Sequence, residues 1–225
     1  MTRGPRLVLL GKQGAGKGTQ ASRLAEHYDI HHLATGDFLR DAAAAGTPLG
    51  LEAKAYMDQG SLVPDELVDG VVDEQLHVDD RVARGFVLDG YPRNRHQAQR
   101  LDETLGEERL DLAVDLDVPT EVVLHRIAGR RVCTQCGAVY HVDNPPEHDW
   151  TCDVCGGSVE QRDDDTADAV MRRLELYEME TLPVIQHYRR AGILAHVDGG
   201  AETEEVFKHL VELVESRFDP RTAAL

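Results

Sequence analysis

Residues 7–20 read LVLLGKQGAGKGTQ, an apolar run followed by a glycine-rich turn with a lysine near its end. The stretch that follows, ASRLA at 21–25, favours a helix. In a strand, loop and helix of this kind, the glycines let successive backbone N–H groups converge on one anion, and the positive end of the helix points to the same place. Lys17 adds a mobile charge for the outer phosphates. We therefore predict a nucleoside-phosphate site here, and a plain glycine turn is the weaker interpretation.

One position departs from the general phosphate-loop motif. A serine or threonine normally follows the lysine and holds magnesium directly, whereas here Gly18 follows it and the hydroxyl comes one residue later, at Thr19. This shift restricts the families to which the chain can belong.

Short apolar runs recur along the chain, separated by longer stretches with helical spacing. They lie at residues 7–10, 31–34, 86–88, 112–116 and 193–197. This alternation predicts an α/β fold with a five-stranded parallel sheet flanked by helices. The stretch between the second and third runs is longer than one crossover helix needs, so we expect an insert there. A helix is expected over 167–190, where Pro183 can bend it.

Composition restricts the partners. The 225 residues include 41 acidic and 24 basic side chains, which give a formal charge of −17. Such a field repels nucleic acid and anionic membranes, so neither is expected as a partner, and an anionic substrate needs a local cluster of positive groups. No apolar stretch has the length of a signal or a membrane span. We expect a soluble cytoplasmic protein.

The four cysteines lie in a segment that loses helical spacing. Cys133 and Cys136 form one C-x2-C pair and Cys152 and Cys155 another, with fifteen residues between the pairs and a glycine after each. Four thiolates at this spacing predict a tetrahedral structural zinc site. Two disulfides or four unrelated thiols are the alternatives, and a cytoplasmic location disfavours them. His141 and His148 lie nearby, and we interpret both as surface residues.

Further motifs follow the phosphate loop in order. Residues 33–40 read LATGDFLR, and residues 88–93 read LDGYPR, with Gln97 four places later. LVPDELV at 62–68, RIAGRR at 126–131 and QRDDD at 161–165 complete the set. Together they resemble the bacterial adenylate kinases over nearly the whole chain, and the cysteine segment resembles the zinc-bearing lid of the long-lid members. Three departures stand out: Gln13 replaces a proline and is expected to alter the stiffness of the loop, Tyr91 replaces a phenylalanine, and residues 140–146 are one residue short.

The resemblance implies one domain of three parts: a core (1–33, 64–128 and 166–225), an AMP-binding insert (34–63) and a zinc lid (129–165). It implies reversible, magnesium-dependent transfer of a phosphoryl group from ATP to AMP, giving two ADP, by a monomer. A kinase of another nucleoside monophosphate is an alternative. A nucleotide-switched protein whose zinc lobe binds nucleic acid is another, which the lack of lysine and arginine in residues 143–160 disfavours.

The resemblance also assigns roles to residues. Catalytic positions are Lys17, Arg93, Arg126, Arg130, Arg162 and Arg173. ATP contacts are expected from Gly14, Ala15, Gly16, Lys17, Gly18, Thr19, Arg126, Val139, Tyr140 and Ala201. AMP contacts are expected from Thr35, Arg40, Ser61, Leu62, Val63, Gly90, Tyr91, Pro92, Arg93, Gln97, Arg162 and Arg173. Asp89 is expected to hold magnesium through water.

The reaction agrees with these residue types. Phosphoryl transfer between nucleotides gathers many negative charges and depends on positioning and neutralisation, which arginines supply. We expect the lid and the insert to close over nucleotides so that water is excluded. Without nucleotide, the lid arginines are expected to repel one another, and Asp164 and Asp165 to receive them on closure, whereas Asp163 is equally well explained as a soluble loop residue.

Overall fold

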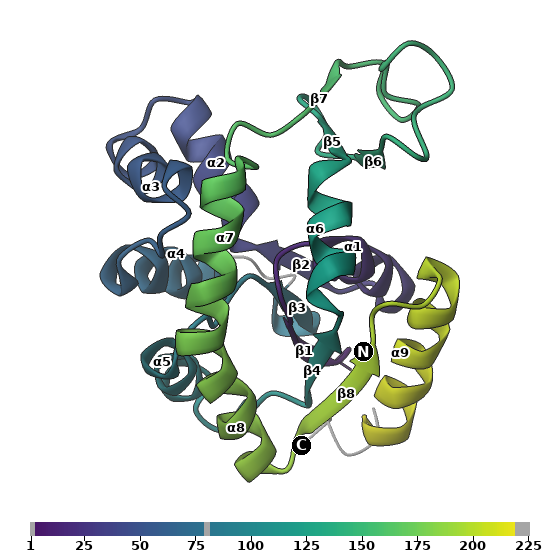
Figure 1. Cartoon of the computed structure of the whole chain (residues 1–225). Helices are drawn as coiled ribbons and strands as arrows, with labels where there is room; N and C mark the ends of the chain where they lie inside the picture. The colour runs from purple at the N-terminus through teal and green to yellow at the C-terminus, as the bar shows by residue number, and fades with distance from the viewer. Residues whose placement is uncertain (1–2, 79–81, 219–225) are drawn as a thin grey trace.

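A five-stranded sheet forms the centre of the computed structural model, which describes residues 3–78 and 82–218. The strands are β1 (Arg6–Leu10), β2 (His31–Ala34), β3 (Phe86–Asp89), β4 (Leu112–Asp117) and β8 (Leu194–Asp198). They pair in the order β2-β3-β1-β4-β8, and every pairing is parallel (Figure 1). Each apolar run of the sequence forms one of these strands, so the predicted α/β fold is confirmed.

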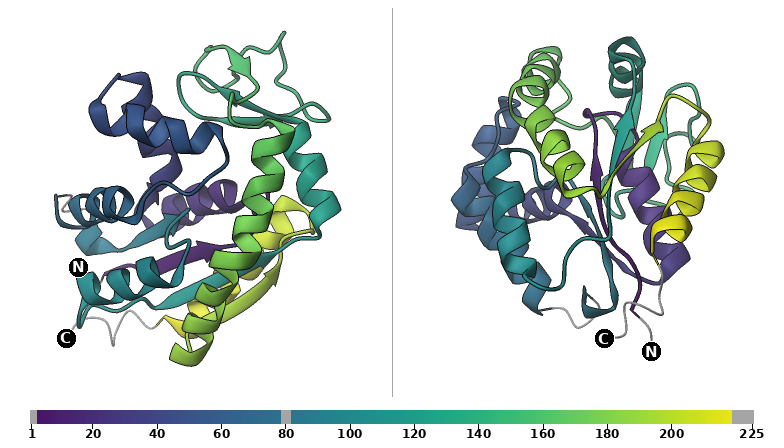
Figure 2. Two further views of the ribbon diagram at one scale, coloured as in Figure 1. Left: turned by 60° about the vertical axis from the view of Figure 1, so that its left-hand side comes forward. Right: turned by 90° about the horizontal axis from the view of Figure 1, so that it is seen from below.

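Helices cover both faces of the sheet (Figure 2). One face carries α1 (Lys17–Tyr28) and α9 (Thr203–Arg217), and α4 (Asp65–Val78), α5 (Arg95–Leu105) and α8 (Leu182–Ala191) cover the other. A short 3-10 turn, η1 (Val82–Arg84), precedes β3. No helix in the part of the chain described is long and apolar enough to cross a membrane.

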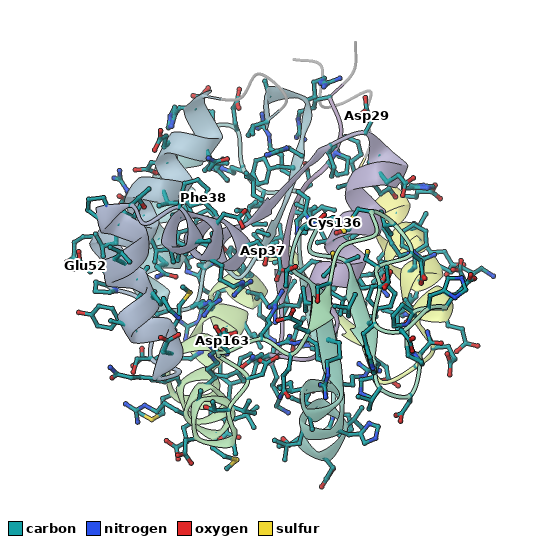
Figure 3. All side chains as sticks on the ribbon, turned by 90° about the horizontal axis from the view of Figure 1, so that it is seen from above. Asp29, Asp37, Phe38, Glu52, Cys136 and Asp163 are labelled. Atoms are coloured by element: carbon teal, nitrogen blue, oxygen red, sulfur yellow. The ribbon has the colours of Figure 1, made fainter. Side chains whose placement is uncertain are left out.

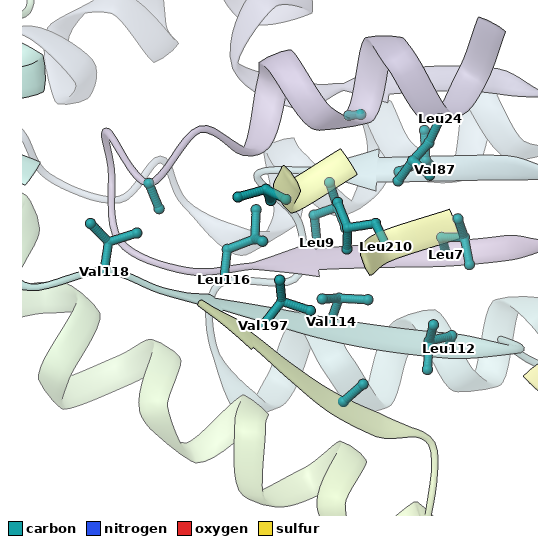
Figure 4. Packing of buried hydrophobic residues seen from close by; sticks show 14 of the residues in the cluster. Leu7, Leu9, Leu24, Val87, Leu112, Val114, Leu116, Val118, Val197 and Leu210 are labelled. Atoms are coloured by element: carbon teal, nitrogen blue, oxygen red, sulfur yellow. The ribbon is translucent and has the colours of Figure 1, made fainter. Parts of the chain in front are cut away.

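Strand β1 has both faces buried. Leu7 and Leu9 pack with Leu24 of α1 and Leu210 of α9 (Figure 4), whereas Val8 and Leu10 join the cluster on the opposite face. This alternation follows from the two-residue period of a strand, and burial on both faces explains why the run is apolar throughout. The phosphate loop therefore begins on the most enclosed strand of the sheet.

The insert lies between β2 and β3. It contains α2 (Thr35–Ala44) and α3 (Pro48–Asp58), and α4 follows it. The two helices of the insert pack closely at Gly50. A Cβ at this position would lie only 2.1 Å from the backbone carbonyl carbon of Ala42, so a glycine is needed there. Thr47 caps α3 by accepting a hydrogen bond from the Gly50 N–H. The extra helical material predicted for this stretch is present.

The lid segment, residues 129–165, follows α6 (Thr120–Ala128). It contains β5 (Arg130–Cys133), β6 (Val139–His141) and β7 (Val159–Glu160), which form an antiparallel sheet in the order β6-β5-β7. Its own buried cluster consists of Cys133, Cys152 and Val159 among the described residues. The lid is thus a separate lobe with very little apolar interior.

The prediction of a single helix over 167–190 is wrong in one respect. The structure has α7 (Ala167–Leu176), a π-helical turn η2 (Tyr177–Thr181) and then α8. Pro183 does not interrupt α8, because it lies in the first turn, where a missing N–H costs no hydrogen bond. The irregular turn lies before it, where the Thr181 hydroxyl donates to the Arg93 carbonyl (2.7 Å).

Candidate active site

A cleft of about 1060 Å³ opens at the carboxyl ends of the parallel strands. In this sheet β1 lies between β3 and β4, the arrangement at which open α/β folds bind ligands. The phosphate loop (residues 11–20), the insert, the lid and α7 all contribute to its lining. Every residue to which the sequence assigned an ATP or AMP contact lines this cleft, and so do Arg130 and Asp89. Seen from above, the labelled Asp37 and Cys136, which also line it, lie toward the middle of the molecule, and Glu52 lies at its edge (Figure 3).

The phosphate loop depends on its glycines. Gly16 has a φ of 96° and precedes the first residue of α1, a left-handed conformation that other residues rarely adopt. A side chain at Gly18 would place its Cβ 3.2 Å from Asp89 Oδ2. The glycine that replaces the usual serine or threonine therefore lets the start of α1 approach the Asp89 carboxylate.

Lys17 has lost much of its hydration inside this loop. Its Nζ donates to the carbonyl oxygens of Gly11 (2.8 Å) and Lys12 (2.9 Å). Burial lowers the pKa of Lys17 to about 8, although the nearby Asp89 carboxylate acts in the opposite direction. An ammonium group has three donors, so one remains for an anion in the cleft. An anionic phosphate would stabilise the charged form that burial now disfavours.

Arginines approach the cleft from three directions. Arg93 follows β3, Arg40 lies on α2 of the insert, and Arg173 lies on α7. Burial lowers the pKa of Arg93, and the positive charges of Arg173 and Arg40 add to this effect. Burial also lowers the pKa of Arg162 in the lid to about 10. Several cations held close together with little water around them form the local positive cluster that an acidic chain needs to attract nucleotides.

Carboxylates hold these arginines in place. Arg40 is paired with Asp37 on the same helix, and Arg162 Nη2 reaches the same carboxylate from the lid (3.4 Å). Arg173 Nη2 donates to Asp164 Oδ2 (2.7 Å) and to the Met57 carbonyl (2.9 Å). Burial works against ionisation of Asp164, but Arg173, Arg40 and Arg162 together outweigh it and lower the pKa of this carboxyl.

Two arginines lie at the junction of core and lid: Arg126 in the last turn of α6 and Arg130 at the start of β5. Arg126 Nη1 donates to the Gly199 carbonyl (2.8 Å), close to the predicted ATP contact at Ala201. Arg130 makes a two-pronged pair with the buried Asp165, which also accepts from Gln13 Nε2 of the phosphate loop (3.1 Å). The expected repulsion between lid arginines is present, because burial lowers the pKa of Arg162 and the charge of Arg130 contributes to this shift. The expectation that they meet carboxylates only on closure over nucleotide is wrong, because Arg130 is already paired with Asp165 and Arg162 with Asp37. Asp163 is exposed, in agreement with its interpretation as a soluble loop residue.

Several residues that are expected to contact AMP also form hydrogen bonds with neighbouring residues of the cleft. Thr35 Oγ1 donates to the Asp89 carbonyl (3.2 Å). Gln97 is 2 % exposed; its Nε2 donates to Asp65 Oδ1 (2.7 Å), and its Oε1 accepts from the Arg93 N–H (2.7 Å). It is therefore no ordinary surface glutamine, and it positions the loop that ends in Arg93. The hydroxyl of Tyr91, the residue that replaces a phenylalanine, donates to the buried Asp69 (2.8 Å).

Tyr140 supports the lid itself. Its hydroxyl donates to Cys152 Sγ (3.4 Å) and accepts from the Asp153 N–H (2.8 Å), and this contact lowers the pKa of the Cys152 thiol to about 6. Val139 beside it is half exposed and lines the cleft. The hydroxyl of Tyr140 is thus used within the lid, and the residue lines the cleft beside Val139.

The four cysteines converge on one point. All four are free, and their Sγ atoms lie within 4.8 Å of one another, at 3.5 Å for Cys133–Cys155 and 3.6 Å for Cys136–Cys152. Disulfide sulfurs are about 2.05 Å apart, so the alternative of two disulfides does not describe this arrangement. Sulfurs at the corners of a tetrahedron with metal–sulfur bonds of about 2.3 Å would lie somewhat under 4 Å apart, so the four thiols fit a zinc ion.

Comparison with known proteins places the chain among its relatives. A family model described as "Adenylate kinase" matches residues 9–193. The adenylate kinase of Thermodesulfovibrio yellowstonii is 50 % identical over 215 residues, which cover 94 % of this chain and all of the relative. That of Archaeoglobus fulgidus is 49 % identical over 212 residues, which cover 93 % of this chain and 97 % of the relative. The chain belongs to the adenylate kinase family. It is therefore an enzyme, a nucleotide-binding transferase of the kinase type.

Some residues of this adenylate kinase cleft were missed by sequence reasoning. Asp37 pairs with arginines of both the insert and the lid, and its spacing of three residues from Arg40 on a helix was a usable signal. Gln13 was noted only for the stiffness of the loop, whereas it links the loop to Asp165. His141 was interpreted as a surface residue, and this is wrong: it is half-buried and lines the cleft, whereas His148 is exposed as expected.

Proposed function

We propose that this chain catalyses the reversible transfer of the terminal phosphoryl group of ATP to AMP, giving two molecules of ADP. The observation that carries the proposal is that a phosphate loop and arginines from the insert, the lid and α7 line one cleft. Membership of the adenylate kinase family supports the choice of both nucleotides.

We assign the ATP phosphates to the phosphate loop. The N–H groups from Gly14 to Thr19 and the ammonium group of Lys17 would bind them, with Arg126 approaching from α6 and Arg130 from the lid. Val139, Tyr140 and Ala201 would lie near the base or ribose. A loop that is already folded around a partly buried lysine neutralises charge without further reorganisation.

We assign the AMP phosphate to Arg40 and Arg93, and the transferring group to Arg162 and Arg173. Their guanidinium groups now pair with Asp37 and Asp164 or donate to backbone carbonyls. Phosphate oxygens would take up the remaining guanidinium donors, while the carboxylates keep each group oriented. Adenine would lie near Thr35, Gln97 and residues 61–63, with the loop at 90–92 beside it. Catalysis is then mainly alignment of the two nucleotides and neutralisation of their charge.

We propose that the chain consists of a core (1–33, 64–128, 166–225), an insert (34–63) and a lid (129–165). The insert and the lid would move relative to the core. Closure of the insert and the lid would exclude water and so prevent hydrolysis of ATP. The Arg162–Asp37 contact, which joins the lid to the insert, supports such closure. Opening of these parts is expected to limit turnover.

Two metal ions accompany the proposal. Asp89 and Thr19 both line the cleft beside the phosphate loop, and Asp89 would hold magnesium through water. When bound, magnesium neutralises charge on the ATP phosphates. A zinc ion held by Cys133, Cys136, Cys152 and Cys155 would leave no open position, so its role would be to stabilise the lid.

We further propose a cytoplasmic monomer that binds neither nucleic acid nor membranes. The formal charge of −17 supports the last two points, since both of these partners are anionic.

The test is direct. Purified protein is mixed with ATP, magnesium and AMP, and ADP is measured, with GMP, CMP and UMP as alternative acceptors. We expect ADP to form from AMP in preference to the other three. Equal or faster reaction with another monophosphate would change the assigned acceptor, and ATP hydrolysis that is independent of any acceptor would contradict the proposal.

A further inference from the structure

A second group of metal-ligating side chains lies at the base of the lid, apart from the four cysteines. His125 lies in the last turn of α6, His141 ends β6, and Asp143 lies in the turn that follows. Asp143 Oδ2 is 3.5 Å from His125 Nε2 and 3.2 Å from His141 Nδ1, and the three ligand atoms lie within 4.8 Å of one another. Figure 1 shows α6 leading directly into the lid sheet at this point.

These distances suit ligands that share one ion. In a tetrahedral site with metal–nitrogen and metal–oxygen bonds of about 2.0–2.1 Å, neighbouring ligand atoms are roughly 3.3 Å apart. Two imidazoles and one carboxylate are also a ligand set that zinc and similar divalent transition ions accept. Magnesium prefers oxygen ligands and retains its water, so it is a poor candidate.

The ring of His141 is already oriented for coordination. Its Nε2 lies 3.3 Å from the His125 carbonyl oxygen, so Nε2 carries the hydrogen and Nδ1 faces Asp143 with a lone pair. Histidines that bind metals usually donate their other N–H to such a carbonyl or carboxylate. The Asp143 N–H also reaches Nδ1 (3.1 Å), and an ion would replace this hydrogen bond.

Gly129 makes room for this ring. A Cβ on Gly129 would lie 2.1 Å from His141 Nε2, although the backbone there is ordinary right-handed helix. The glycine is therefore required by the close approach of the imidazole and not by its own conformation. Close packing fixes the ring at the joint between α6 and the lid.

We propose that His125, His141 and Asp143 form a second metal site, specific for a divalent transition ion such as Zn²⁺, Co²⁺ or Ni²⁺. The three ligands line the lid side of the same cleft, but binding of the ion needs neither nucleotide. His125 belongs to α6 and precedes Gly129 in the chain, whereas His141 and Asp143 belong to the lid and follow it. An ion bound there ties the lid to the core helix.

The test uses the folded chain with zinc already bound at its cysteines, titrated with Co²⁺ and followed by visible absorption. We expect one further Co²⁺ per chain, with the d–d bands of nitrogen and oxygen ligands and without thiolate-to-cobalt charge transfer. His125→Gln and Asp143→Asn should each weaken this binding at least about tenfold, since even outer contacts of a metal ligand are worth 10–100-fold. His148→Gln, which changes an exposed lid histidine outside the group, should bind as the parent does.

Both altered side chains are exposed, so the variants should fold and retain their cysteine-bound zinc, which circular dichroism and metal analysis check. Three results would overturn the proposal: no binding of Co²⁺ beyond the cysteine site, bands that show only cobalt at thiolates, or binding that His125→Gln and Asp143→Asn leave unchanged.

Discussion

The phosphate loop and the lid supply charge to the same cleft, but they are held in place differently. The loop joins β1 to α1, and both elements belong to the large buried cluster of the core. The lid has its own small sheet, whose buried cluster among the described residues is Cys133, Cys152 and Val159. So small an apolar interior stabilises little, and lobes of this kind depend on bound metal for their folding free energy. The loop is thus a product of the fold, whereas we expect the stability of the lid to depend on a metal ion bound at its cysteines.

The charged groups of the phosphate loop and of the lid are also held in place differently. The loop presents backbone N–H groups and one partly buried lysine that are already in position. The lid presents Arg130 and Arg162, which are paired with Asp165 and Asp37. We therefore expect changes to Lys17 to act mainly on the chemical step. Changes in the lid and in its contacts, such as the Gln13–Asp165 hydrogen bond, should act on the order and closure of the lid.

Lys17→Ala should give the largest effect, a loss of about a hundredfold or more in turnover, because it removes one preorganised charge at a developing anion. Lys12→Ala is the matched control. Lys12 lies in the same loop, but its Nζ donates to the Val118 carbonyl (3.0 Å) and it is not among the proposed ATP contacts. Steady-state kinetics with ATP and AMP check both variants. Near-native turnover of Lys17→Ala would contradict the role of this lysine.

Removal of zinc should unfold the lid and leave the core folded. Chelation is expected to make the amides of residues 130–160 exchange rapidly with deuterium, while the strands from β1 to β4 stay protected, because the metal stabilises only the lobe that holds it. Hydrogen-exchange mass spectrometry checks this, and metal analysis confirms the loss of zinc. Uniform loss of protection would show that the lid is not the separate unit described above.

The pH dependence of kcat/KM for ATP should report the ionisation of Lys17. Because its pKa is lowered to about 8, the free enzyme loses this charge as the pH rises through that value, and kcat/KM for ATP should fall on the alkaline side. Bound phosphates stabilise the cation, so the corresponding fall in kcat should lie at higher pH. Initial-rate profiles on both parameters check the prediction, and a kcat/KM profile that is flat through pH 9 would contradict it.

The smallest effect is expected for Gln13→Met, which keeps the length of the side chain and removes its hydrogen bond to Asp165. Arg130 still holds Asp165, so the loss should be about 1 kcal/mol, or roughly fivefold, and should affect nucleotide binding more than turnover. Titration calorimetry with ATP measures it. A large fall in turnover would place Gln13 in the chemical step, contrary to the comparison of loop and lid.

The sequence predicts what is local. The apolar runs predict the strands, and the glycines and Lys17 predict the phosphate loop, because each depends on residues next to one another. Contacts between distant segments do not follow from such patterns. The pairing of Arg130 with Asp165, the buried position of Gln97 and the use of the Tyr140 hydroxyl by Cys152 arise only when the chain folds. The surface prediction for His141 failed because the missing side chain of Gly129 admits its ring.

The central claim is that one cleft joins a preformed loop to charges from two other parts of the chain. Hydrogen exchange with an inhibitor that carries two adenosines joined by a phosphate chain tests it most directly. We predict that one equivalent protects the loop at 11–18, the insert at 35–63 and the lid at 129–165 together. Protection limited to the loop, with the insert and the lid unchanged at saturation, would contradict the account.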